Sequence, residues 1–145
     1  MKNGALVIGA SVLSVALAHT ADGGERLRLI ERATNEHTVQ RTPKADSLGD
    51  LIVFANPLYE ADSTKSVGTS RGFCVRTEVG VGWQCTFSLE LPKGSCIVEG
   101  HYPDSGEAQF AVVGGTGLYT GAHGTLRVHP RDSAHSTYDF DAELL

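Results

Sequence analysis

Residues 83–89 have the sequence WQCTFSL, in which apolar and polar side chains alternate at every position. Because successive side chains on a β-strand point to opposite faces, this period of two is typical of a strand with one buried face. The preceding segment, residues 66–77, is also strand-like, although it contains Gly68 and Gly72. We therefore expect the two segments to pair as a β-hairpin around Val79 and Gly80.

The register of this hairpin brings two cysteines together. If Val79 and Gly80 form a two-residue turn, counting back from the turn places Cys74 directly opposite Cys85. Directly opposed residues have Cβ atoms about 4.5–5.5 Å apart, closer in non-hydrogen-bonded pairs, and a disulfide requires about 3.5–4.5 Å. The spacing predicts a disulfide between Cys74 and Cys85 in an oxidising compartment. The alternative is a pair of buried thiols that act as small hydrophobic side chains.

Similar short segments follow one another along the chain after residue 24. They are residues 26–32, 50–56, 95–102, 108–113, 125–129 and 138–144. About eight short strands with glycine and proline between them indicate an all-β barrel or sandwich. Pro57 is expected to end its strand, and the polar residues 34–48 are expected to form a loop or overhang.

The N-terminal segment has the three parts of a secretory signal peptide. Lys2 precedes an apolar run over residues 5–18, which ends in the small-residue pattern Ala16-Leu17-Ala18. We expect residues 1–18 to be this leader, residues 19–145 to form one domain, and the protein to be secreted or extracytoplasmic. The alternatives are an uncleaved N-terminal anchor and a buried strand with a turn.

Composition argues against several function classes. The net charge is −5 and no basic patch is visible, so a nucleic-acid partner is not expected. The three cysteines and six histidines show no zinc-site spacing, so no metal is expected, and Cys96 is left over from the predicted disulfide. The segment from Gly114 to Gly117 lacks the Gly-Lys-Ser/Thr ending of a phosphate loop, and we expect it to form a tight turn.

Several segments resemble plant allene oxide cyclases and the related dirigent proteins. They are GDLIVFANPLY (residues 49–59), GFCV (72–75), WQCTF (83–87), GHY (100–102) and GGTGLYTGAHG (114–124). The resemblance extends from about Arg28 to the C-terminus. It implies a single closed eight-stranded antiparallel β-barrel, assembled as a dimer or trimer, that needs no cofactor. It also implies a hydrophobic small molecule as the substrate or ligand.

The resemblance also implies a set of pocket residues. Carried over position by position, they are Glu31, Ile52, Phe54, Asn56, Cys74, Trp83 and Tyr102. The spacing agrees with part of this set, since Ile52, Phe54 and Asn56 alternate and share one face of a strand. Burial would raise the pKa of a carboxyl group at position 31 and suit it to acid–base catalysis.

Each residue also has a structural interpretation. The Glu31 carboxylate could lie in solvent, paired with Arg32 or Arg76. Trp83 and Tyr102 could belong to the barrel core, and Asn56 could satisfy backbone groups before Pro57.

Two departures concern the chemistry of these families. The cyclases have an asparagine at the position of Ala33, and dirigent proteins carry acidic residues where this chain has Ala55 and Asn56. Three functions therefore stay open. The first is a cofactor-free cyclase or isomerase in which Glu31 is catalytic. The second is a non-catalytic dirigent-like or lipophilic ligand-binding barrel. The third is a secreted interaction protein whose barrel is filled by side chains.

Overall fold

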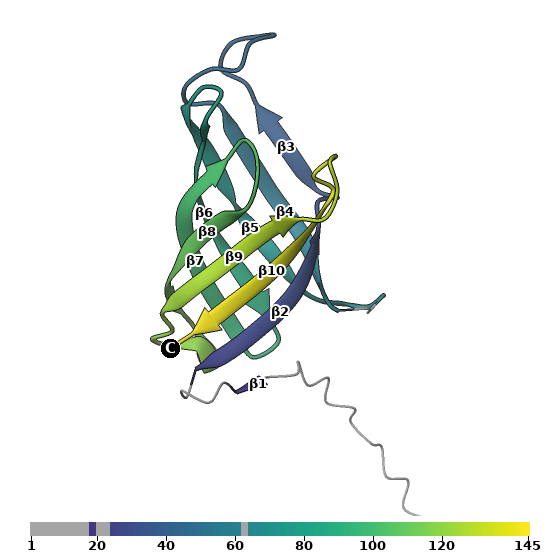
Figure 1. The fold of residues 1–145 in the computed structure, drawn as a ribbon, viewed down its shortest axis with the longest axis vertical. Coiled ribbons are helices and arrows are strands. Elements are labelled where there is room, and N and C mark those ends of the chain that lie inside the picture. The colour runs from purple at the N-terminus through teal and green to yellow at the C-terminus, as the bar shows by residue number, and fades with distance from the viewer. Residues whose placement is uncertain (1–17, 20–23, 62–63) are drawn as a thin grey trace, which may run out of the picture.

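The computed structural model describes residues 18–19, 24–61 and 64–145, and within them eight strands close into an antiparallel barrel (Figure 1). Around the barrel the order is β2-β10-β9-β8-β7-β6-β5-β4, and pairing of β2 with β4 closes the ring. The barrel strands are β2 (Glu25–Arg32), β4 (Leu51–Glu60), β5 (Ser66–Glu78), β6 (Gly82–Leu91), β7 (Gly94–Pro103), β8 (Ala108–Gly115), β9 (Gly124–Pro130) and β10 (Thr137–Leu144). The predicted eight-stranded barrel is confirmed.

Three further short elements are attached to the barrel. Strand β1 (Ala18–His19) pairs with the start of β2, and β3 (Glu36–Val39) pairs with the first half of β4. A 3₁₀ helix, η1 (Gly117–Tyr119), connects β8 to β9. The leader expected over residues 1–18 lies outside the described residues except for Ala18. None of the helices in the described part of the chain is long and apolar enough to cross a membrane.

The β5–β6 hairpin has the predicted cysteine pair but not the predicted turn. Glu78 pairs with Gly82 around a three-residue turn, whereas Cys74 pairs with Cys85, so the register shifts by one residue between Arg76 and Glu78. This β-bulge absorbs the extra turn residue and restores the cross-strand alignment. The two cysteines form a disulfide, with Cα atoms 4.0 Å apart.

Two expectations about the first half of the chain are wrong. The segment expected as a loop contains β3, and β4 continues through Pro57 to Glu60. The amide of Ala55 donates to Asn35 O, on the side of β4 where the chain passes from β2 to β3. The backbone nitrogen of Pro57, two residues further along, points to the same side of β4. On that side β3 pairs with residues 51–54 and β2 with residues 58–60, so Pro57 lies between these two partner strands. Its missing N–H therefore removes no bond from the ladder.

The Gly114–Gly117 segment packs against the β6–β7 turn. Leu118 N donates to Lys93 O over 2.9 Å. Gly117 has a φ of +59°, and a Cβ atom there would lie 2.3 Å from Lys93 O. Only glycine allows both this φ and this close approach without strain. The segment thus makes the tight connection that the sequence predicted.

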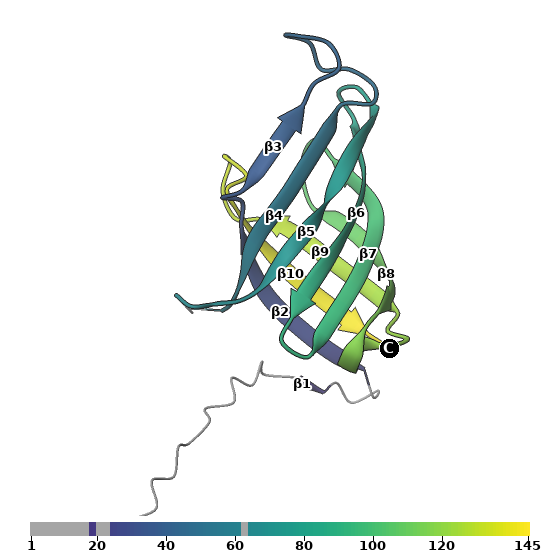
Figure 2. The same ribbon diagram turned by 180° about the vertical axis from the view of Figure 1, so that it is seen from behind.

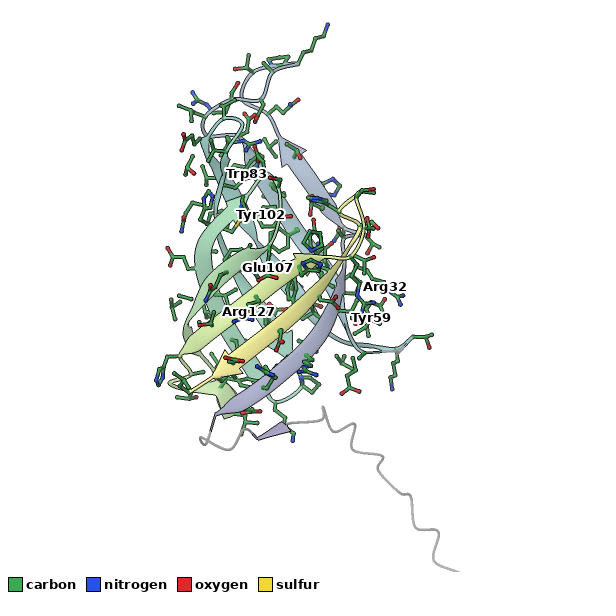
Figure 3. All side chains as sticks on the ribbon, in the orientation of Figure 1. Arg32, Tyr59, Trp83, Tyr102, Glu107 and Arg127 are labelled. Carbon is green, nitrogen blue, oxygen red and sulfur yellow. A yellow bond between two sulfur atoms is a disulfide. The ribbon has the colours of Figure 1, made fainter. Side chains whose placement is uncertain are left out.

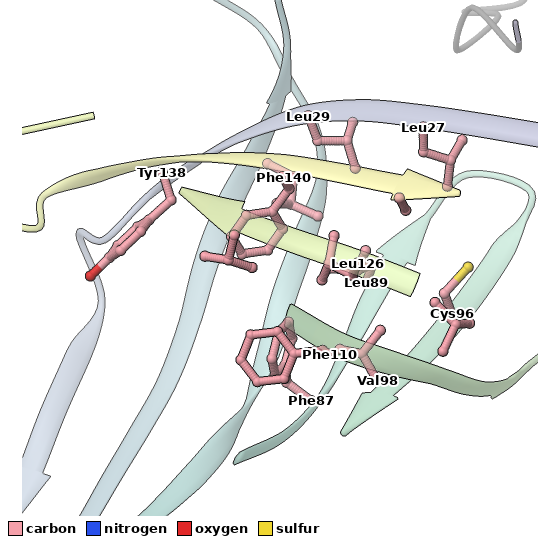
Figure 4. Close-up of a cluster of buried hydrophobic side chains, with 14 of the residues drawn as sticks. Leu27, Leu29, Phe87, Leu89, Cys96, Val98, Phe110, Leu126, Tyr138 and Phe140 are labelled. Atoms are coloured by element: carbon pink, nitrogen blue, oxygen red, sulfur yellow. The ribbon is translucent and has the colours of Figure 1, made fainter. Parts of the chain in front are cut away.

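The barrel interior is filled at one end and more open toward the other. Figure 4 shows aliphatic side chains and Cys96 toward the end where the chain terminates, and aromatic rings toward the opposite end. The view from behind in Figure 2 shows β3 outside the barrel wall, beside β4 near that opposite end. The aliphatic residues leave no side-chain polar groups to satisfy, so this half acts as the hydrophobic core.

Candidate active site

A cavity of about 80 Å³ lies in the aromatic half of the barrel. Six aromatic rings line it, from residues Phe54, Phe87, Phe110, Phe140, Tyr102 and Tyr138. The remaining walls come from Glu31, Glu36, Ile52, Val128 and the Cys74–Cys85 disulfide. Among these residues Glu36, Ile52, Phe54 and Tyr102 keep some exposure, so the cavity reaches solvent on their side, next to β3.

Phe87 is the centre of the aromatic lining. Its ring centroid lies 5.7 Å from that of Phe54 and 5.2 Å from that of Phe110, both in edge-on geometry, and 6.1 Å from that of Phe140. Edge-to-face rings at these separations attract one another beyond the effect of their burial. The aromatic wall is therefore a packed and ordered surface rather than a set of independent side chains.

Glu31 is the buried carboxyl group of the cavity. Strand β2 directs its side chain inward, where only 5% of the residue remains exposed. Burial raises the pKa of Glu31 to about 7, since the interior disfavours the charged form. The nearby Ser70 hydroxyl and the hydrogen bond from Asn56 oppose this rise, and the nearby Glu36 carboxylate adds to it. The Glu31 carboxyl group therefore changes protonation near neutral pH.

Asn56 donates a hydrogen bond to one oxygen of the Glu31 carboxyl group. Its Oδ1 accepts a hydrogen bond from the backbone N–H of Asn35 over 2.9 Å, and its Nδ2 donates to Glu31 Oε1 over 3.2 Å. A backbone N–H can only donate, so Oδ1 must face Asn35 and the amide NH₂ must face Glu31. The orientation of Asn56, which is fully buried, is thus set by the backbone.

The other oxygen of Glu31 is available. Within the described residues, Glu31 Oε2 and the hydroxyl of the fully buried Ser70 have no hydrogen-bond partner of ordinary geometry. Ser70 lies beside Asn56 on the neighbouring strand, and its hydroxyl still lowers the pKa of Glu31 through proximity. The Ser70 hydroxyl and Glu31 Oε2 are therefore close but not joined by a hydrogen bond of ordinary geometry, and a bound polar group could contact both.

A pair of tyrosines forms the second polar part of the lining. Tyr102 OH lies 3.4 Å from Tyr138 OH and 3.4 Å from His135 Nδ1. Burial is the main cause that raises the pKa of both hydroxyl groups, so both stay protonated near neutral pH. Tyr102 donates its single hydroxyl proton to Tyr138 or to His135, which leaves the hydroxyl proton of Tyr138 available to a bound molecule.

Trp83 lies outside the cavity wall. The guanidinium of Arg76 stacks over its ring at 4.0 Å, and Arg76 also bonds to Asp46 and Asp104. These contacts join the β3–β4 and β7–β8 connections at the end of the barrel near Tyr102 (Figure 3). Through Arg76, Trp83 therefore helps to hold two connecting loops together next to the cavity.

The structure brings together five of the seven predicted pocket residues at the cavity, which are Glu31, Ile52, Phe54, Cys74 and Tyr102. Asn56 contacts the cavity through Glu31 rather than lining it. The alternative pairing of Glu31 with an arginine is absent, because Arg76 bonds to two aspartates and Arg32 stacks on Tyr59 at 4.1 Å (Figure 3).

Sequence reasoning missed four polar residues of the site. Glu36 falls in the segment expected to be a loop, and Ser70 interrupts the apolar period of its strand. Tyr138 alternates with Phe140 on the inward face of β10, but the contact of Tyr138 with Tyr102 joins strands that are not neighbours. His135 lies in the β9–β10 connection, where no periodicity marks it.

The described residues contain no group of three or more His, Cys, Asp or Glu side chains arranged to hold a metal ion. The cavity wall offers the Glu31 carboxyl group, whose pKa lies near neutrality, the two tyrosine hydroxyl groups and an aromatic surface.

Solved structures share this barrel. A pyocyanin demethylase has a TM-score of 0.73 and 21% sequence identity, covering 83% of this chain and 99% of that protein. A pterocarpan synthase dirigent protein has a TM-score of 0.71 and 16% identity, covering 84% and 94% of the two chains. The Diels–Alderase AbmU from Streptomyces koyangensis has a TM-score of 0.69 and 17% identity, covering 83% and 63%. At these identities the likeness shows the fold.

The sequence itself matches a family model over residues 29–131, which is more than half of the chain, and that model describes allene oxide cyclase. The matched segment runs from the middle of β2 through β9 and includes Glu31, Asn56 and most of the aromatic lining. The chain therefore belongs to the allene oxide cyclase family.

Proposed function

We propose that this protein is a cofactor-free cyclase or isomerase that holds a reactive hydrophobic small molecule in the barrel cavity. The observation that carries the proposal is the position of Glu31, a buried carboxyl group on the wall of a mainly aromatic cavity, with one oxygen that has no hydrogen bond of ordinary geometry. Ligand sites commonly combine an apolar wall with a few convergent polar groups. The fold shared with dirigent proteins and Diels–Alderases supports a cyclase-like or dirigent-like role.

Glu31 would exchange a proton with the substrate. An acid or base is most effective when its pKa lies near the working pH, and burial raises the pKa of Glu31 to about 7. Asn56 fixes the carboxyl plane from one side, which leaves Oε2 as the atom that contacts the substrate. Tyr138, which accepts a hydrogen bond from Tyr102, would donate its own to a substrate oxygen. The aromatic wall would hold the reacting conformation and exclude water.

The cavity limits what can be bound. Its volume of about 80 Å³ is below the roughly 300–1,000 Å³ of sites for drug-sized ligands. A long substrate would therefore place only its reacting portion between Glu31 and the tyrosines, and the remainder would extend past Phe54 toward solvent. The runner-up function is a dirigent-like or lipophilic ligand-binding barrel that uses the same cavity without proton transfer by Glu31.

We also infer that the protein works outside the cytoplasm as a homo-oligomer. The disulfide and the leader pattern over residues 1–18 support export, because disulfides persist in oxidising compartments. A dimer or trimer is the assembly that the family resemblance implies.

The test is native mass spectrometry of the purified protein with a panel of fatty-acid, polyketide and phenolic ligands, followed by analysis of products. We expect wild type to bind and convert a member of the panel, and Glu31→Gln to bind it without conversion. Glu99→Gln, on the exposed outer face of β7, is the matched control and is expected to behave as wild type. Binding with no difference between wild type and Glu31→Gln would favour the non-catalytic barrel, and no binding at all would refute both functions.

A further inference from the structure

The charges around the cavity are all of one sign. Among the described residues that line it, the ionisable acids are Glu31 and Glu36, and no lysine or arginine contributes to the wall. Arg76, which lies beside Trp83 at the same end of the barrel, is held by two aspartates and the indole ring. An anionic group in the cavity would therefore meet two carboxylates and no available cation.

The apolar part of the wall is suited to positive charge. Six aromatic rings surround a small volume, and the two tyrosine rings pack edge-on, with centroids 6.5 Å apart. The face of an aromatic ring carries negative electrostatic potential, and several rings around one cavity form the cages that bind quaternary ammonium groups. A cation on an unsaturated ring would contact such faces and lose little hydration on entering.

The position of Glu31 completes this arrangement. Oε2 is buried and has no hydrogen bond of ordinary geometry, whereas Oε1 accepts one from Asn56. The hydroxyl of Ser70, which lies near the carboxyl group, is neutral and supplies no positive charge. An ionised carboxylate in this position is destabilised by burial, and a cation in the cavity would supply the missing opposite charge. The titratable groups that face Glu31 are Glu36 on β3, Tyr102 on β7 and Tyr138 on β10, none of which can supply that charge.

We propose that the barrel cavity binds small planar organic cations and rejects anions of the same shape. This inference rests on the proposed function, since it uses the same cavity, and it specifies the charge of the molecule or fragment that lies between Glu31 and the aromatic rings. Fatty-acid carboxylates would then bind only with the carboxylate outside the cavity. Aromatic rings with a quaternary nitrogen would bind with the ring inside.

Three probes of one shape test the proposal, namely N-methylpyridinium, toluene and benzoate. Their affinities are measured by ¹H–¹⁵N NMR titration at pH 8 for wild type, Glu31→Gln and Glu99→Gln. We expect N-methylpyridinium to bind wild type and Glu99→Gln equally, and Glu31→Gln to bind it at least tenfold more weakly. Toluene is expected to bind all three proteins within about twofold, and benzoate to bind none of them.

The wild-type protein alone gives a second measurement that does not depend on the stability of a variant. With the pKa of Glu31 at about 7, the ionised fraction rises about tenfold between pH 6 and pH 8. The affinity for N-methylpyridinium is expected to rise by about the same factor, and the affinity for toluene to stay constant. Ionisation of Glu36 adds to the rise in the same direction, since it faces the same cavity.

The outcomes separate this inference from the proposed function. If toluene binds in the cavity but N-methylpyridinium does not, or if both lose affinity equally in Glu31→Gln, the cation preference is wrong and the ligand-binding barrel stands. If neither probe shifts signals from residues around the cavity, both the preference and the proposed function are refuted.

Discussion

Replacing Glu31 by glutamine is expected to stabilise the folded protein above neutral pH and to change its stability little near pH 4. The carboxyl group has an ordinary pKa of 4.5, and burial raises it to about 7 in the folded protein. Below pH 4.5 the group is protonated in both the folded and the unfolded state. Between pH 4.5 and 7 the unfolded state loses the proton while the folded state retains it, so the wild-type protein loses stability.

The size of this loss follows from the two pKa values. The difference between 4.5 and 7 corresponds to about 3 kcal/mol, at about 1.4 kcal/mol for each tenfold change in proton affinity. Glutamine does not titrate, and its amide oxygen can still accept the hydrogen bond from Asn56. The free energy of unfolding of Glu31→Gln is therefore expected to exceed that of wild type by about 3 kcal/mol at pH 8, with the gain appearing as the pH rises from 4.5 to 7.

Urea denaturation at pH 4, 6 and 8, followed by the fluorescence of Trp83, measures this difference. The chain contains one tryptophan, which is buried next to Arg76, so its emission reports unfolding of the barrel. Glu99→Gln is the control for the loss of one negative charge and is expected to show no such pH dependence. A stability difference between wild type and Glu31→Gln that is the same at all three pH values would show that the Glu31 carboxyl group is solvated, and the reasoning about the site would fail.

Reduction of the disulfide and two further substitutions test other parts of the structure. Reducing the Cys74–Cys85 disulfide is expected to lower the free energy of unfolding by about 2–3 kcal/mol, because the unfolded chain is no longer constrained by a short closed loop. Urea denaturation with and without dithiothreitol measures this difference. No effect of the reductant would mean that the bond is absent. Asn56→Leu is expected to cost about 2–4 kcal/mol by the same assay, since it leaves the buried Oε1 of Glu31 and the partly buried backbone N–H of Asn35 without their hydrogen bonds. A loss below about 1 kcal/mol would contradict this role. Gly117→Ala is expected to lower the melting temperature much more than Gly114→Ala, because a Cβ atom at Gly117 would overlap a backbone oxygen and one at Gly114 would meet nothing within 4 Å; equal shifts in calorimetry would refute the packing argument.

The fold could be predicted from the sequence because each strand carries its own signal. The alternation in WQCTFSL indicates one strand by itself, and pairing with the segment before it brings Cys74 to Cys85. The turn was predicted one residue too short, and the bulge between Arg76 and Glu78 cancelled the error. Bulges of this kind leave no periodic signal, because one extra residue on one strand changes only the local pairing.

The continuation of β4 through Pro57 could not be predicted from local rules. Proline normally ends a strand because it lacks a donor. Here the missing donor faces the gap between β2 and β3, and the position of that gap depends on how β2 closes the barrel. Ring closure is a property of the whole chain, so no single segment reveals it.

The candidate site could be predicted only in part, because some of its contacts depend on how the whole barrel closes. Ile52 and Phe54 share a strand face, so alternation alone places them together. The meeting of Tyr102 with Tyr138 and His135 joins β7 to β10 and its preceding loop across the barrel. The partnerless oxygen of Glu31 and the hydroxyl of Ser70 depend on side-chain geometry that strand patterns do not contain.

A crystal structure of the protein with a bound member of the ligand panel tests the central claim most directly. The account predicts electron density for the ligand inside the barrel, between Glu31 Oε2 and the hydroxyl groups of Tyr102 and Tyr138, in contact with the ring of Phe87. Density for the ligand only on the outer surface, or at the opposite end of the barrel beside Tyr119, with the aromatic cavity unchanged, would contradict it.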